Sequence, residues 1–168
     1  MTRLFGRLVL QYFADPALVL RRLATLVKPG GLVAFQESDM KDGVYSEPVC
    51  PVYETATQRI AQTFTRIGAD PRTGSKLAQI FEEAGLPTPQ MILHARVEHG
   101  SDSPIYDLAA QITRVMLPLM QRTGVATAQE VGVETLAERI RAEAVALDAT
   151  LVTPPFIGAW TRTPLTSQ

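Results

Sequence analysis

The stretch RLVLQYFADPALVLRRLATLVKPGGLVAFQESD, residues 7–39, limits the fold of this chain more than any other part of the sequence. An apolar run from Leu4 to Leu10 precedes a turn signal and predicts a buried strand whose carboxyl end lies near Gly6. Leu32 to Phe35 is a second continuous apolar run, which is typical of a strand in a sheet covered on both faces. Two strands therefore flank the middle of this stretch.

The segment between these strands predicts a helix. Asp15 suits the N-cap, and Pro16 suits the first helical position, where its missing N–H costs nothing. Apolar residues then recur with helical spacing, and Lys28-Pro29-Gly30-Gly31 predicts the end of the helix. Strand, helix and strand in so short a span indicate parallel strands joined by a right-handed crossover.

Parallel strands place their carboxyl ends at one edge of a sheet, where open α/β proteins bind ligands. Gly6, Arg7 and Leu8 follow the first strand. The residues that follow the second strand are Gln36, Glu37, Ser38 and Asp39. This edge is therefore the first place to expect a site.

The rest of the chain predicts further helices and two more strands. The predicted helices span 52–67, 75–84 and 104–117, and Pro118 is expected to kink or end the third. A further helix begins near Thr127 or Thr135, and Thr127-Ala128-Gln129-Glu130 fits a capping box. The predicted strands span 90–97 and 150–161, and Pro154-Pro155 places a bulge or an edge in the second.

Composition excludes several partners. The 168 residues suffice for one domain, and a formal net charge of −1 with scattered Lys and Arg predicts no binding to nucleic acid or a membrane surface. The absence of a signal-peptide pattern or a bilayer-length apolar run favours a cytoplasmic protein. Cys50, the only cysteine, leaves no internal disulfide and no thiolate metal site.

An ordered set of segments gives the chain a family likeness: GRLVLQYFADP, then LVKPGGLVAFQESD, then FEEAGL ahead of a strand, and a final PPFIGAW. The chain resembles the C-terminal half of class I S-adenosylmethionine-dependent methyltransferases, in particular the small-molecule type similar to the ubiquinone- and menaquinone-biosynthesis enzymes. In that family a hxVLxYxxDP segment follows the fourth strand and L(K/R)PGG leads into the fifth. Leu8 to Pro16 and Leu26 to Gly31 match these patterns.

The resemblance implies an α/β fold, a partial Rossmann-like sheet made of strands 4 to 7 of the family order with inserted helices. Gln90 to Val97 would be the sixth strand. Thr150 to Trp160 would be the seventh, antiparallel between the fifth and sixth. Residues 103–148 would form a helical insertion that covers the substrate, within a single domain that spans 1–168.

The resemblance also implies transfer of a methyl group from S-adenosyl-L-methionine to a small-molecule acceptor. The loop after the family's fourth strand touches this cosubstrate, which assigns cofactor binding to Gly6, Arg7, Leu8 and Gln11. An alternative interpretation is that Gly6 only permits a tight strand exit and that Arg7 is solvated. The sequence names no acceptor.

Four further residues are candidates for binding the substrate. Glu37 and Asp39 lie at a strand end, where a carboxylate binds substrate or accepts a proton, although a solvated strand end has the same pattern. Met116 and Met120 lie one helical turn apart and would line an apolar pocket, or belong to a core stripe. His94 and His99 have no spacing for a metal site, so no metal is expected.

Two family features are missing from the 168 residues: the Gly-rich loop after the first strand, and the acidic residue after the second strand that holds the ribose. No G-x-G run occurs in the sequence. The expectation is therefore an N-terminally truncated methyltransferase domain that binds S-adenosylmethionine weakly or not at all when isolated.

A non-enzymatic hypothesis follows from the same absence. The chain would then be an inactive fragment or an interaction module that needs a complementary N-terminal half. Its first strand would present an unpaired edge, through which it would form a homodimer or bind that complementary chain.

Overall fold

The computed structural model describes residues 1–40 and 45–165. The chain forms two compact units. The sheet unit consists of Met1–Asp39, Ala69–His94 and Pro155–Gln168, and the helical unit consists of Met40–Gly68 and Ala95–Pro154. The predicted insertion, 103–148, lies within the helical unit. The expectation of a single domain over 1–168 stays a prediction.

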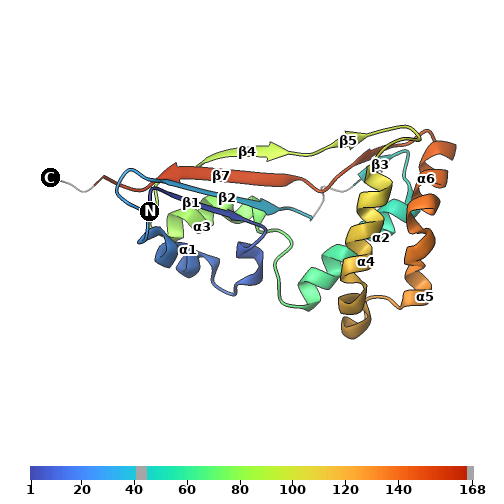
Figure 1. Cartoon of the computed structure of the whole chain (residues 1–168), viewed down its shortest axis with the longest axis horizontal. Helices are drawn as coiled ribbons and strands as arrows, with labels where there is room; N and C mark the ends of the chain where they lie inside the picture. The colour runs from blue at the N-terminus through green and yellow to red at the C-terminus, as the bar shows by residue number, and fades with distance from the viewer. Residues whose placement is uncertain (41–44, 166–168) are drawn as a thin grey trace. The chain divides into compact units, whose positions relative to one another are not determined.

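The sheet unit contains a four-stranded mixed sheet in the order β1-β2-β7-β4 (Figure 1). Its strands are β1 (Arg3–Arg7), β2 (Leu32–Ser38), β7 (Phe156–Arg162) and β4 (Gln90–His94). Strand β1 is parallel to β2, whereas β7 is antiparallel to both β2 and β4. The fold is α/β, and the predicted antiparallel strand between the fifth and sixth family strands is confirmed.

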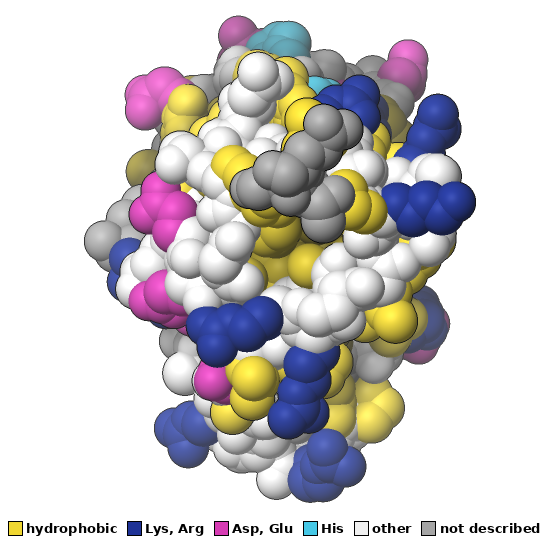
Figure 2. Space-filling model, turned by 90° about the vertical axis from the view of Figure 1, so that its left-hand side faces the viewer, with side chains coloured by type: hydrophobic (Ala, Val, Ile, Leu, Met, Phe, Trp, Pro, Cys, Tyr) yellow, Lys and Arg dark blue, Asp and Glu magenta, His cyan; other side chains and the backbone are white. Residues whose placement is uncertain are grey.

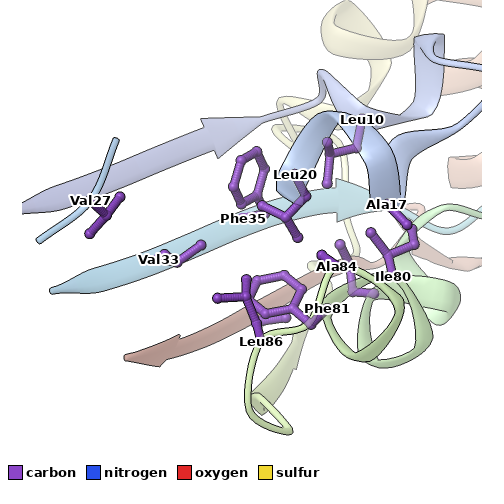
Figure 3. Close-up of a cluster of buried hydrophobic side chains, with 12 residues drawn as sticks. Leu10, Ala17, Leu20, Val27, Val33, Phe35, Ile80, Phe81, Ala84 and Leu86 are labelled. Carbon is purple, nitrogen blue, oxygen red and sulfur yellow. The ribbon is translucent and has the colours of Figure 1, made fainter. Parts of the chain in front are cut away.

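The helices of this unit are α1 (Pro16–Ala24), α3 (Leu77–Glu83) and the short 3-10 segments η1 (Leu10–Tyr12) and η2 (Gly74–Lys76). The predicted N-cap is confirmed, because the Asp15 carboxylate accepts the Leu18 N–H at 2.8 Å. The core of the unit lies between the sheet and these helices. Figure 3 shows Leu10 and Leu20 from the helical segments beside Phe35 from β2.

Only one face of this sheet carries the core, so the prediction of buried strands covered on both faces is wrong. Val33 and Phe35 of β2 are buried, but Ala34 and Gln36, on the opposite face, are partly exposed. In β1, Phe5 is 64% exposed. The apolar run is continuous because Ala34 and Phe5 are apolar too, which hides the two-residue alternation of a one-sided strand.

The end of the sheet unit at which β1 begins carries exposed apolar side chains among Lys and Arg side chains (Figure 2). This end is opposite the carboxyl ends of β1 and β2 (Figure 1). Figure 2 therefore does not show the edge at which β1 and β2 end, where the sequence predicts a site.

The helical unit contains a three-stranded antiparallel sheet and three main helices. The strands, in the order β3-β6-β5, are β3 (Tyr45–Glu47), β6 (Thr150–Val152) and β5 (Val97–Glu98). The helical segments are α2 (Pro51–Arg66), α4 (Ile105–Thr123), α5 (Ala128–Val131), η3 (Val133–Thr135) and α6 (Leu136–Ala146). The predicted capping box is present, since the Thr127 side chain and Glu130 cap each other's backbone N–H groups.

Three predicted elements differ from the structure. The segment 90–97 is two strands, β4 and β5, and 150–161 is likewise divided into β6 and β7. Each of these segments passes from one unit to the other, and Pro154-Pro155 lies at the second division. Helix α4 does not end at Pro118 but continues to Thr123.

Candidate functional site

The candidate site lies where β1 and β2 end side by side. In the parallel register, Gly6 pairs with Phe35 and Arg7 with Gln36. The Leu8 N–H continues the pairing, because it donates to the Gln36 carbonyl at 2.9 Å. The structure thus brings together the two segments that the sequence analysis placed at one edge.

The chain turns sharply after β1. Leu8 has a φ of +52°, in the left-handed region that a leucine rarely adopts. The 3-10 segment η1 then begins at Leu10. Strain of this kind costs about 1–3 kcal/mol and persists only where surrounding contacts fix the backbone.

Glu37 of β2 provides such contacts. Its side chain is fully buried, at 0% exposure, and Oε1 accepts the N–H groups of Val9 at 3.0 Å and of Leu10 at 2.9 Å. Loss of hydration raises the pKa of this carboxyl above its usual value, and the N–H groups of Leu10, Val9 and Gln11 oppose that shift. The second oxygen, Oε2, is buried and has no hydrogen-bond partner among the described residues.

Gln11 fixes the same loop from its other end. Its side chain is 2% exposed, and its Oε1 accepts the Ser38 hydroxyl at 3.2 Å. Its carbonyl accepts the Asp70 N–H at 2.8 Å. The loop is thereby bound both to the end of β2 and to the segment that precedes η2.

Contacts within the protein account for the residue types at positions 6 and 7 without a ligand. A Cβ on Gly6 would overlap the ring of Phe35, so glycine makes room for this core residue. The Arg7 guanidinium lies 5.5 Å from the centre of the Phe156 ring, a cation–π contact. Their assignment to cofactor binding stays a prediction.

The predicted substrate residues are not equivalent. Glu37 is turned into the backbone of the loop, whereas Asp39 is half-buried and its N–H donates to the Pro155 carbonyl at 2.9 Å. Met116 and Met120 belong to the helical unit, at 8% and 0% exposure, in a cluster with Ile60 and Val131. This packing is what the core-stripe interpretation expects, and the substrate role of the methionines stays a prediction.

The sequence reasoning missed the burial of Glu37, although its position carries the signal. Val33, Phe35 and Glu37 alternate along β2, so all three share the core-facing side. It also missed a buried pair in the helical unit, where the Cys50 thiol donates to Glu143 Oε2 at 3.0 Å. These residues lie 93 positions apart, so no local pattern predicts their contact.

A groove of about 390 Å³ in the helical unit is lined by α4, η3 and α6. Its charged side chains include Arg114 and Glu134, which form an ion pair with Nη2–Oε2 at 3.0 Å. Among residues 1–40 and 45–165, no three His, Cys, Asp or Glu side chains are placed to hold a metal ion. In the same ranges, no helix has the length and apolar character that a membrane span requires.

Three solved structures align with this chain to different degrees. A candidate methyltransferase from Bacillus halodurans aligns with a TM-score of 0.50 at 11% identity, over 97% of this chain and 70% of its own. Phosphoethanolamine N-methyltransferase 2 of Haemonchus contortus, solved with S-adenosyl-L-methionine, has a TM-score of 0.42 at 17% identity, over 98% of this chain and 33% of its own. The cyclase SpnF has a TM-score of 0.39 at 16% identity, over 98% and 51%.

At these identities the likeness to the Bacillus protein shows a shared fold. No protein-family model matches the sequence. No curated protein matches it either.

Proposed function

We propose that this chain forms part of an S-adenosylmethionine-dependent methyltransferase that acts on a small molecule. The observation that carries the proposal is the fixed loop at the carboxyl ends of β1 and β2. Leu8 bends this loop, and Glu37 holds it by two backbone N–H groups. In α/β sheets this edge is where ligands bind, and the shared fold and the LVKPGG segment support the class of reaction.

The reaction moves a methyl group from the sulfonium sulfur to a nucleophilic atom of the acceptor, which leaves S-adenosylhomocysteine and releases the acceptor's proton if it carries one. Such catalysis depends mainly on alignment of the two reactants. The backbone of residues 8–11 would flank the cosubstrate, with Gly6, Arg7 and Gln11 beside it. Half-buried Asp39 is the better placed of the two carboxylates to meet an acceptor, because Glu37 is enclosed.

We further propose that these residues bind S-adenosylmethionine with low affinity. The loop after β1 is a single element, and the 168 residues contain no G-x-G run that would cradle the cosubstrate from a second side. The helices of 103–148 would select the acceptor, with Met116 and Met120 supporting them from the core.

A second candidate function, an interaction module, is favoured by the edge of the sheet. Among the residues that the structure describes, strand β1 pairs with β2 only, and Phe5 beside this edge is 64% exposed. Antiparallel self-pairing centred on Phe5 would place Arg3 opposite Arg7 of the second copy, and like charges in that position repel. A complementary chain that adds a strand is therefore the better occupant than a homodimer.

Titration of the ¹⁵N-labelled chain with S-adenosylmethionine tests the first proposal. We expect saturable amide shifts at residues 8–11 with a Kd weaker than about 0.1 mM. The absence of shifts there at 10 mM ligand, a concentration about 100-fold higher, rejects the cosubstrate. A low-micromolar Kd would support S-adenosylmethionine as the cosubstrate but would contradict low affinity.

Size-exclusion chromatography with light scattering tests the second function. A monomer that gains a strand partner is the expected state of an interaction module. R3E replaces the repulsion between Arg3 and Arg7 of the second copy with an attraction, so it should strengthen a homodimer that pairs through β1. A stable homodimer that R3E strengthens no more than T65A does would contradict pairing through β1.

A further inference from the structure

Glu37 is buried more completely than a substrate-binding carboxylate needs to be. Its side chain is 0% exposed, and its Oε1 is shared between the Val9 N–H and the Leu10 N–H, from residues 28 and 27 positions earlier in the chain. The carboxylate therefore acts first on the backbone of the loop.

The N–H groups at the start of η1 require an acceptor from outside the segment. Val9 occupies the N-cap position of η1 but offers no side-chain hydrogen bond to it. The first N–H groups of a helical segment have no partner within the segment and require one from elsewhere. Glu37 supplies it from the neighbouring strand, in place of a local Ser, Thr or Asp.

The bend at Leu8 also depends on contacts that fix the loop from outside. A φ of +52° is unfavourable for leucine, so the loop keeps this shape only while contacts beyond it hold the chain. Leu10 supplies one such contact, since its side chain is 1% exposed and lies in the core near Leu20 (Figure 3). The Leu8 N–H bond to the Gln36 carbonyl and the two Glu37 bonds supply the others.

The second oxygen of the carboxyl takes no part in holding the loop. Oε2 is buried without a partner among the described residues, and an unsatisfied buried polar atom costs free energy. A glutamine could offer its one carbonyl oxygen to both N–H groups without burying a charge. The shape of the loop therefore depends on an acceptor oxygen at the end of a side chain of this length, which glutamate and glutamine both supply.

We propose that Glu37 is a positioning residue, whose carboxylate holds the Val9 and Leu10 backbone in the shape in which the loop after β1 receives S-adenosylmethionine. This inference rests on the proposed function. It replaces direct substrate binding by Glu37 with an indirect role, in which the residue acts through the loop and does not touch the reactants.

The test compares three variants with one control. E37D keeps the charge but shortens the side chain by one methylene, E37A removes the acceptor, and E37Q keeps an acceptor of the same length. E82Q removes a carboxylate charge from an exposed position of α3 and serves as the control. Thermal unfolding of each variant verifies that it folds.

Two readouts separate positioning from general stability. Amide hydrogen exchange at Val9 and Leu10 should accelerate at least tenfold in E37D and E37A, by roughly the loss of one to two hydrogen bonds, but less than about threefold in E37Q. Exchange in β2 and α3 should stay unchanged in all folded variants. The Kd for S-adenosylmethionine should rise about tenfold in E37D and little in E37Q or E82Q.

Unchanged exchange at Val9 and Leu10 in E37D would overturn the inference, as would equal acceleration throughout the sheet unit. Unchanged affinity in E37D, with loosened loop amides, would overturn the link between loop shape and ligand. If E37A does not fold, E37D and E37Q decide the question. If the parent chain shows no response to S-adenosylmethionine while E37D selectively loosens Val9 and Leu10, the proposed function fails and the positioning of the loop by Glu37 stands.

Discussion

In each of the two units, a carboxylate from a distant part of the chain accepts hydrogen bonds at the start of a helical segment. The two carboxylates differ in their hydrogen-bond partners. In the helical unit, Glu143 of α6 accepts the Val52 N–H at 2.8 Å and the Cys50 thiol at 3.0 Å. In the sheet unit, Glu37 of β2 accepts two N–H groups through Oε1, while Oε2 has no partner among the described residues.

Their surroundings differ as well. Glu143 is partly exposed, whereas Glu37 is fully buried. A partly hydrated carboxylate anchors α2 at little cost, because water continues to solvate part of the charge. The same task at Glu37 carries a desolvation cost, and the difference marks the loop after β1 as a place where geometry matters beyond stability.

The largest effect we expect concerns Cys50. Burial and the hydrogen bond to Glu143 raise the pKa of its thiol to about 12. At pH 8 the thiolate fraction is then about 10⁻⁴, so Ellman's reagent should modify the folded chain at least about 1,000-fold more slowly than free cysteine. Complete reaction in urea is the control. Rapid modification of the folded chain would contradict the described anchoring of α2.

The second effect concerns Glu143 itself. E143A leaves the Val52 N–H and the Cys50 thiol without this acceptor, and we expect the free energy of unfolding to fall by about 1–3 kcal/mol. E143Q keeps an acceptor and should lose less. Urea denaturation measures both variants. Equal losses in E143A and E143Q would mean that charge, and not hydrogen bonding, is what anchors α2.

A smaller effect is expected at Asp15, which caps α1 locally. D15A removes the carboxylate that accepts the Leu18 N–H and should lower the free energy of unfolding by about 1 kcal/mol. D15N should retain most of the cap. This pair compares an exposed local cap with the half-buried anchor at Glu143. A larger loss in D15A than in E143A would contradict the order that we derive from burial.

The smallest effect is a pH dependence that belongs to Glu37. Because burial raises its pKa in the folded state, the folded chain binds a proton more tightly than the unfolded chain does. The contribution to stability is fully present below the usual glutamate pKa and is lost as the pH rises through the raised value. E37Q lacks this titration, so the difference in unfolding free energy between E37Q and the parent should shift in favour of E37Q from pH 4 to pH 8. A constant difference over this range would contradict the raised pKa.

Local patterns predicted the elements that local interactions form. The Asp15-Pro16 start of α1, the capping box at Thr127 and the place of β7 all follow from short-range spacing or from an ordered set of motifs. The division of 90–97 and of 150–161 into two strands each was not predictable in this way, because the division depends on which unit each half joins.

The candidate site was predictable by place but not by role. Parallel strands fix its edge, so Gly6, Leu8 and Glu37 fall together. The role of Glu37 depends on two N–H groups nearly 30 positions away, whose availability follows from the bend at Leu8. Sequence spacing does not encode that bend, since leucine rarely adopts it.

The most direct test of the central claim is photochemical cross-linking of the chain with methyl-labelled S-adenosylmethionine, followed by trypsin digestion. Cleavage after Arg7 and Arg21 releases the loop after β1 as the peptide Leu8–Arg21. We expect this peptide to carry most of the label, excess unlabelled S-adenosylmethionine to suppress the labelling, and E37D to reduce it while E82Q does not. Label confined to peptides of the helical unit would contradict binding of S-adenosylmethionine at the loop after β1. Equal labelling of the Leu8–Arg21 peptide in E37D and the parent would contradict the positioning role of Glu37.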